Sequence, residues 1–181
     1  MPVADPRPLI GEPISLDLLN TRWIHEGEPR DLLADADGLR IWLEGNGLAD
    51  RFTADGATLM HTRAARDALV ALADGTDSAA AAAARVDEVL AHGRIRATLT
   101  SQGPGEEAEF ADPAWGPAWT AAHGHLALLR TAPDRIRACA HEACVLHFFD
   151  TSRSGTRRWC SMALCGNRTK ASRHYAKTRE S

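Results

Sequence analysis

Apolar residues recur with helical spacing in four segments of the chain: residues 31–48, 55–73, 78–92 and 112–132. Asp35 or Asp37 can cap the first helix, and the other three segments begin at an Asp or Ser that can act as a cap; each segment ends near Gly or Pro. The third segment opens with a run of six alanines, which favours helix strongly. The pattern predicts a mainly helical protein. In the fourth segment, residues 112–132, the residues expected to face inward are Trp115, Trp119, Leu126 and Leu129.

A β-hairpin is predicted between the third and fourth helices. Residues 94–100 alternate between polar and apolar side chains, as a half-buried strand does. Residues 102–105 contain two glycines and a proline and are expected to form the turn, and residues 106–110 the partner strand. The chain therefore combines helices with a small sheet.

The segment 12–24 fits two patterns. Ile14, Leu16 and Leu18 alternate as in a strand, whereas Leu16, Leu19 and Trp23 have almost helical spacing. We interpret the segment as a short strand or extended entry followed by a helical turn.

Charge divides the chain into an acidic and a basic part. Residues 1–129 hold ten arginines against twenty acids, and residues 130–181 hold eleven Lys or Arg against four acids. A basic tail on an acidic body favours contact with a polyanion such as DNA, although packing of the tail on the acidic body would explain the same asymmetry. We place the domain boundary at Pro133, between an acidic domain 1–132 and a basic domain 133–181.

The four cysteines of the chain form two matched pairs in the basic part. Both pairs have four residues between the cysteines, and fifteen residues separate one pair from the other. Two such pairs can supply four thiolates to one tetrahedral zinc, whereas unrelated buried thiols or two disulfides would not require matched spacing. Residues 1–13 do not resemble a signal peptide and no segment is apolar enough to span a membrane, so we expect a cytoplasmic protein with reduced thiols. The predicted ligands of a single structural Zn²⁺ are Cys139, Cys144, Cys160 and Cys165.

The two cysteine pairs are expected in different local structures. Residues 135–149 read as a tight hairpin with a polar knuckle, and Ser161 can cap a helix that begins near Met162. A knuckle combined with a helix N-terminus is a treble-clef-like arrangement, in which zinc supplies most of the stability. His141 and His147 lie near the first pair, but four thiolates leave them no place on the metal, and we expect both on the surface. The predicted fold class is α+β: a helical N-terminal domain with a small sheet, followed by a four-cysteine zinc finger.

Longer motifs around the cysteines resemble the CGNR zinc finger, a bacterial family named after a tetrapeptide that stands here at Cys165-Gly-Asn-Arg168. The residues preceding it, Cys139-x4-Cys144-x3-Phe148-x-Asp150-x-Ser152 and Arg158-Trp-Cys-Ser-Met162, fit the same family. Leu16-Asp-Leu-Leu-Asn-Thr-Arg22 and Trp42-Leu43 are similar to the ABATE-type domain that usually precedes this finger. The resemblance implies a stress-responsive transcriptional regulator.

A basic stripe is predicted along the last helix, residues 162–179. Lys170, Arg173 and Lys177 fall on one face, and Arg157 and Arg158 extend the basic surface before Cys160. We expect these five residues to contact DNA phosphates, with a solvated helix face as the alternative. Asp150, Ser152 and Arg168 are expected to have structural roles around the metal, with Arg168 pairing with Asp150.

The N-terminal domain carries a polar cluster that could bind a small ligand. Asn20, Arg22 and Trp23 offer an amide, a guanidinium and an aromatic wall, and Arg22 could hold a carboxylate or phosphate. In the alternative interpretation Asn20 caps a turn and Arg22 pairs with an acid of the same domain.

No catalytic arrangement stands out in the sequence. His147, Asp150 and Ser152 are close together but lack the setting of a nucleophile, and zinc held by four cysteines has no open position for water. We therefore expect a DNA-binding transcriptional regulator and not an enzyme, with a body that senses a ligand or forms a homodimer. The alternative is an adaptor whose basic finger docks on an acidic protein surface.

Overall fold

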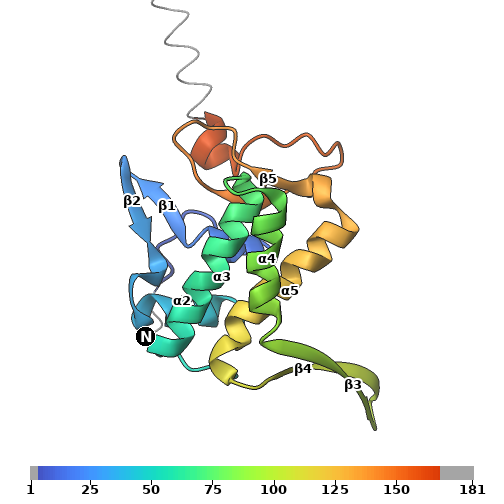
Figure 1. The fold of residues 1–181 in the computed structure, drawn as a ribbon. Helices are drawn as coiled ribbons and strands as arrows, with labels where there is room; N and C mark the ends of the chain where they lie inside the picture. The colour runs from blue at the N-terminus through green and yellow to red at the C-terminus, as the bar shows by residue number, and fades with distance from the viewer. Residues whose placement is uncertain (1–3, 168–181) are drawn as a thin grey trace, which may run out of the picture.

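The computed structural model describes residues 4–167, which form a helical body with a small finger at one end (Figure 1). The body contains five α-helices, and three antiparallel pairs of strands are attached to it or lie in the finger. The predicted α+β, mainly helical class is therefore confirmed. The helices are α1 (Ile14–Leu19), α2 (Ala36–Gly45), α3 (Gly56–Asp74), α4 (Ala79–Leu90) and α5 (Gly116–Thr131). The strands are β1 (Arg22–His25), β2 (Glu28–Asp31), β3 (Gly93–Thr100), β4 (Gly103–Phe110), β5 (Ile136–Ala138) and β6 (His147–Phe149), and the short helices are η1 (Leu32–Ala34), η2 (Pro113–Trp115), η3 (Pro133–Arg135) and η4 (Met162–Gly166).

Side-chain caps fix the beginnings of the predicted helices α2, α3 and α4. Asp35 accepts a hydrogen bond from the backbone N–H of Gly38 at the start of α2, and Asp55 accepts one from Thr58 at the start of α3, both at 2.9 Å. Gly75 ends α3 with φ of 62°, a left-handed conformation that glycine adopts without strain. These boundaries depend on neighbouring residues, which is why the sequence predicts them.

The first segment differs from its predicted order, because it forms a helix first and a strand afterwards. Every residue from 15 to 20 is buried, so α1 has no solvent-facing side that would produce a helical pattern. The helix packs on α3, α5 and β6. The expected strand at its start is wrong because a segment buried all round carries no usable periodicity.

The strand pair β1–β2 was not expected. Its two-residue turn places Glu26 and Gly27 at φ of 52° and 84°. Two successive positive φ angles are typical of the type I′ turn that closes tight hairpins. The Glu-Gly pair is a weaker signal for this turn than Asn-Gly, and the sequence pattern did not reveal it.

The predicted hairpin between α4 and α5 is confirmed as β3–β4, and it extends away from the body at the end opposite the finger (Figure 1). Gly103 and Gly105, expected in the turn, instead pair within β4 with Thr100 and Thr98. In α5 Trp119 is buried as predicted, but Leu129 is exposed, and His125 lies in the interior instead.

One hydrophobic core joins the body and the finger. Leu16, Trp42 and Leu69 are fully buried in the body, and Phe148 of the finger belongs to the same cluster. Arg66 of α3 is also fully buried, and its guanidinium forms paired hydrogen bonds of 2.6 and 2.8 Å with the Asp31 carboxylate. Among residues 4–167 no helix is long and apolar enough to cross a membrane.

Candidate metal centre

The first cysteine pair lies on a knuckle between β5 and β6. The two strands pair from Ile136 opposite Phe149 to Ala138 opposite His147, and the Cys139 N–H continues the ladder by donating to the Leu146 carbonyl at 2.9 Å. The Cys144 N–H donates to the His141 carbonyl at 2.9 Å and closes the turn. The hairpin therefore brings both thiols to the same side, as the sequence predicts.

The second pair is placed around the start of a single helical turn, with Cys160 just before its cap and Cys165 within it. The Ser161 hydroxyl accepts a hydrogen bond from the Leu164 N–H at 2.9 Å, which is the predicted cap, and Cys165 lies in the turn that follows. The turn is of the wide π type and not an α-helix. A Cβ at Gly166 would lie 2.6 Å from the Met162 sulfur, so the half-exposed Met162 side chain would have to move to admit a larger residue there.

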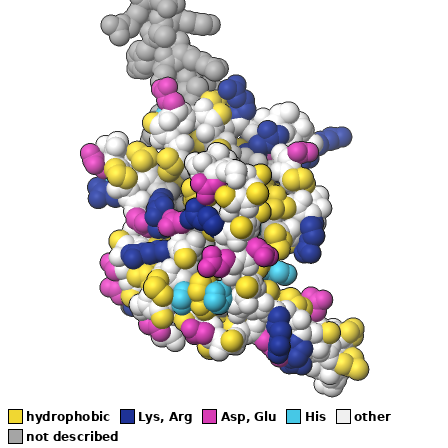
Figure 2. Space-filling view, viewed as in Figure 1, with side chains coloured by type: hydrophobic (Ala, Val, Ile, Leu, Met, Phe, Trp, Pro, Cys, Tyr) yellow, Lys and Arg dark blue, Asp and Glu magenta, His cyan; other side chains and the backbone are white. Residues whose placement is uncertain are grey.

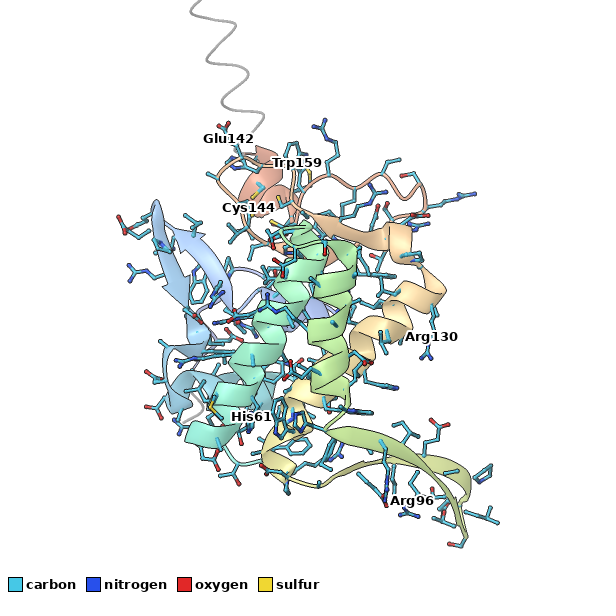
Figure 3. All side chains as sticks on the ribbon, in the orientation of Figure 1. His61, Arg96, Arg130, Glu142, Cys144 and Trp159 are labelled. Carbon is cyan, nitrogen blue, oxygen red and sulfur yellow. The ribbon has the colours of Figure 1, made fainter. Side chains whose placement is uncertain are left out.

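The four sulfur atoms lie within 4.8 Å of one another. The Cys144 and Cys160 sulfurs are 3.9 Å apart, and those of Cys160 and Cys165 are 3.6 Å apart. A tetrahedral zinc with Zn–S bonds of about 2.3 Å holds its sulfurs about 3.8 Å apart. The spacing therefore fits one zinc ion held by four thiolates. Figure 3 shows the Cys144 side chain within the finger, below Glu142 and Trp159.

Without a cation, the cluster disfavours the ionisation of more than one cysteine. Hydrogen bonding from the Cys160 thiol lowers the pKa of Cys144 to about 5. That hydrogen bond, together with burial and the negative charge of Cys144, raises the pKa of Cys160 far above its usual range. Burial raises the pKa of Cys165 to about 12. The first thiolate forms easily, and its negative charge opposes ionisation of the neighbouring thiols. A divalent cation at the centre would compensate the negative charges of the thiolates.

The structure therefore has a four-cysteine site for one structural zinc ion. The metal would cross-link the knuckle to the helical turn, which are far apart along the chain. Backbone groups support the ligands, because the Cys160 N–H points at the Cys139 sulfur at 3.4 Å. Such N–H···S contacts stabilise thiolate charge.

The loop between the two pairs is fastened by residues that were expected to be structural. Asp150 is buried, and its carboxylate accepts hydrogen bonds of 2.9 Å from the backbone N–H groups of Ser152 and Arg157. Arg135 donates to the carbonyl oxygens of Asp150 and Ser152. The predicted partner of Asp150, Arg168, lies outside the described residues.

The residues expected to contact DNA differ in their surroundings. Arg157 is bonded inside the finger, to the carbonyl oxygens of Trp159 and Cys160, and its guanidinium lies over the Phe148 ring. Arg158 is exposed, and its guanidinium carbon lies 5.1 Å from the centroid of the Trp159 ring. The remaining members of the predicted stripe, Lys170, Arg173 and Lys177, lie outside the described residues.

The residues of the predicted polar cluster, Asn20, Arg22 and Trp23, have different roles in the structure. The buried Asn20 amide bonds the finger, donating to the His147 carbonyl and accepting from the His147 N–H, each at 2.8 Å. Arg22 forms ion pairs with Asp31 at 3.3 Å and Asp67 at 3.0 Å, as the alternative interpretation has it. Trp23 is buried beside a cleft.

The contacts that dock the finger on the body were not predicted, although the charge asymmetry left packing of the basic tail on the acidic body open. His147 was expected on the surface, but it is 4% exposed and its Nε2 lies 2.9 Å from the Asp74 carboxylate, so that expectation is wrong. The Phe149 N–H donates to Glu12 at 2.8 Å. These contacts join residues more than seventy positions apart, and no local signal marks them.

Comparison with known families agrees with this architecture. Residues 135–178 match the CGNR zinc finger, and residues 12–138 match the ABATE family, described as "Putative stress-induced transcription regulator". The chain belongs to the ABATE family. The resemblance found in the sequence is thereby confirmed, and a regulatory zinc-binding protein is supported. The descriptions of the two families that match this ABATE protein do not name an enzyme. The curated proteins include no match to it.

Proposed function

We propose that this ABATE protein regulates transcription by binding DNA through its zinc finger. The observation that carries the proposal is the charge of the finger surface. Arg137, Arg153 and Arg158 are exposed there, and Figure 2 shows dark-blue Arg side chains at this end of the molecule. Lys170 and Lys177 lie further along the same basic part of the chain and add to its positive charge. Clustered cations are the electrostatic footprint of phosphate binding.

The finger itself suits a binding role. Its four cysteines fill the coordination sphere of zinc, which then organises the surface and offers no position for substrate. The docking contacts of His147 and Phe149 lie on the body side, so the finger's exposed arginines stay available while it is docked.

The proposal is tested by fluorescence anisotropy of the zinc-loaded full chain with a random DNA duplex at several salt concentrations. We expect affinity to fall steeply with salt, because bound arginines and lysines release counterions. The double variant Lys170→Ala/Lys177→Ala should lower the slope of log K against log salt by about 2, while Arg40→Ala on the body should leave it unchanged. An unaltered slope in the double variant would place the contact surface elsewhere.

An adaptor that binds protein instead of DNA is the second candidate. It is favoured by one observation, the contact that the basic finger already makes with its own acidic body through His147 and Asp74. Absence of DNA binding even at low salt would favour this candidate, and the basic surface would then be a protein-docking face.

A further inference from the structure

A cleft lies where the β1–β2 hairpin, the C-terminal end of α3 and the finger converge. Figure 1 shows these three elements at the same end of the molecule. We name it the junction cleft; its volume is about 460 Å³, within the range of roughly 300–1,000 Å³ typical of small-molecule sites. Its apolar wall consists of Leu19, Trp23, Ile24, Pro29, Val70 and Val145.

The wall is contributed by both parts of the protein. Trp23 and Ile24 come from β1 and Val70 from α3, whereas Val145 belongs to the finger, directly after the zinc ligand Cys144. His147 of β6 also lines the cleft. A molecule in the junction cleft would therefore contact the body and the finger together.

The acids of the junction cleft already have cationic or hydrogen-bonding partners. Asp31 receives two hydrogen bonds from the buried guanidinium of Arg66, which together with Arg22 hold the pKa of Asp31 below its usual value in spite of burial. Asp74 lies 2.9 Å from His147. Neither carboxylate therefore needs a ligand to compensate its charge.

Arg30 differs from the other charged side chains that line the junction cleft. Arg30 is exposed, and within the described part of the chain it forms no ion pair, whereas Arg22 is held by Asp31 and Asp67. Arg30 stands directly opposite Trp23 in the hairpin register, so the two side chains project from the same face. An indole beside an uncompensated guanidinium suits a ligand with an apolar body and a negative end.

We infer that the junction cleft binds a small apolar carboxylate, with its aryl or alkyl body against Trp23 and its carboxylate on Arg30. Because Val145 and His147 lie in the same wall, the bound molecule stabilises the docked position of the finger. This inference concerns the cleft and does not depend on DNA binding by the protein.

Binding is tested by NMR on the zinc-loaded full chain without DNA. The probes are benzoate, phenylacetate and octanoate, each compared with its primary amide, which has nearly the same shape and no charge. The five tryptophan indole N–H signals are followed, with that of Trp23 identified through Trp23→Phe. At least one carboxylate should shift the Trp23 signal, and its amide should bind about tenfold more weakly, since it lacks the charge-assisted hydrogen bond.

Arg30→Gln provides the decisive variant, with Arg40→Gln as the matched control, because Arg40 is an exposed arginine of α2 outside the cleft. Arg30→Gln should weaken carboxylate binding about tenfold and leave amide binding within twofold. The inference is overturned if no carboxylate shifts Trp23 up to about 10 mM, if amides bind equally well, or if Arg30→Gln binds like the parent.

The effect on the finger is measured in the same samples by hydrogen exchange. The His147 N–H, which donates to Asn20, should exchange more slowly when the cleft is saturated with the bound carboxylate. Unchanged exchange at saturation would show that the ligand does not stabilise docking. Because DNA is absent throughout, failure here leaves the proposed DNA binding untouched.

Discussion

The helical body and the zinc finger are neighbours in one core, but they depend on different interactions. In the body, fully buried side chains such as Leu39, Trp42 and Leu69 pack between helices. The described part of the finger contributes Leu146 and Phe148 to that core and otherwise consists of short strands, loops and the four cysteines. The body therefore depends on apolar volume, whereas the finger depends on a metal and on a few polar contacts with the body.

This difference implies that the finger can be released while the body stays folded. The body's helix caps and its Arg66–Asp31 pair are internal to it, whereas its apolar core is shared with Leu146 and Phe148 of the finger. The finger is joined to the body through Asn20, Asp74 and Glu12, each bonded to a residue of β6, and through the apolar side chain of Phe148.

The largest expected effect is loss of the metal. Cys144→Ser removes a thiolate ligand, and because zinc binding contributes about 10 kcal/mol or more to the folding of small zinc modules, the finger should lose both zinc and ordered structure. Zinc content by elemental analysis and amide dispersion of the finger by NMR report the two losses.

The matched control for this substitution is Ala143→Ser, which places the same side chain one residue earlier and leaves all four sulfurs in place. It should keep one zinc per chain. Stoichiometric zinc in Cys144→Ser would contradict the ligand assignment.

A substitution in the core of the body should lower the stability of the protein without loss of zinc. Leu69 is fully buried in α3, and Leu69→Ala should lower the free energy of unfolding by about 2–5 kcal/mol through lost burial and a cavity. Zinc content should stay at one per chain. Urea denaturation of the zinc-loaded protein measures the change, and Leu129→Ala, at an exposed position on α5, should have a much smaller effect.

Breaking the contact between the two parts should have an intermediate effect. Asn20→Ala leaves the buried N–H and carbonyl of His147 without their partner, which should lower the free energy of unfolding by about 1–3 kcal/mol. Zinc should remain bound, and hydrogen exchange at His147 should accelerate.

Asn46→Ala is the control for Asn20→Ala, because the Asn46 amide bonds only body residues, the Asp17 carboxylate and the Trp42 carbonyl. It should destabilise the body without accelerating exchange at His147. Equal acceleration in both variants would mean that the finger responds to global stability and not to the Asn20 contact.

The smallest expected effect concerns pH. Burial and the nearby His147 lower the pKa of His125 in the folded protein, so the unfolded chain binds its proton first, near pH 6.5. The contribution of neutral His125 to stability is therefore full above about pH 6.5 and is lost as pH falls below that value. His125→Gln should flatten the fall in urea midpoint between pH 7.5 and 5.5, and an unchanged slope would assign the effect to other groups.

Local features were predictable to the extent that they depend on neighbouring residues. Asp35, Asp55 and Gly75 mark helix ends through hydrogen bonds and φ angles within a few positions, and the structure confirms them. The segment 12–24 was not predictable in the same way, because α1 is buried on all sides and only its packing partners decide that it is a helix. The surface position expected for His147 failed for the same reason.

The sequence by itself determined the helices α2, α3, α4 and α5, the hairpin β3–β4 and the metal ligand set, because caps, alternation and cysteine spacing act over a few residues or through one ion. Only the tertiary structure decided that Asn20 bonds the finger across 127 positions and that Trp23 and Arg30 share a cleft with Val145. Burial depends on which surfaces meet, and a residue's own neighbours in the chain do not carry that information.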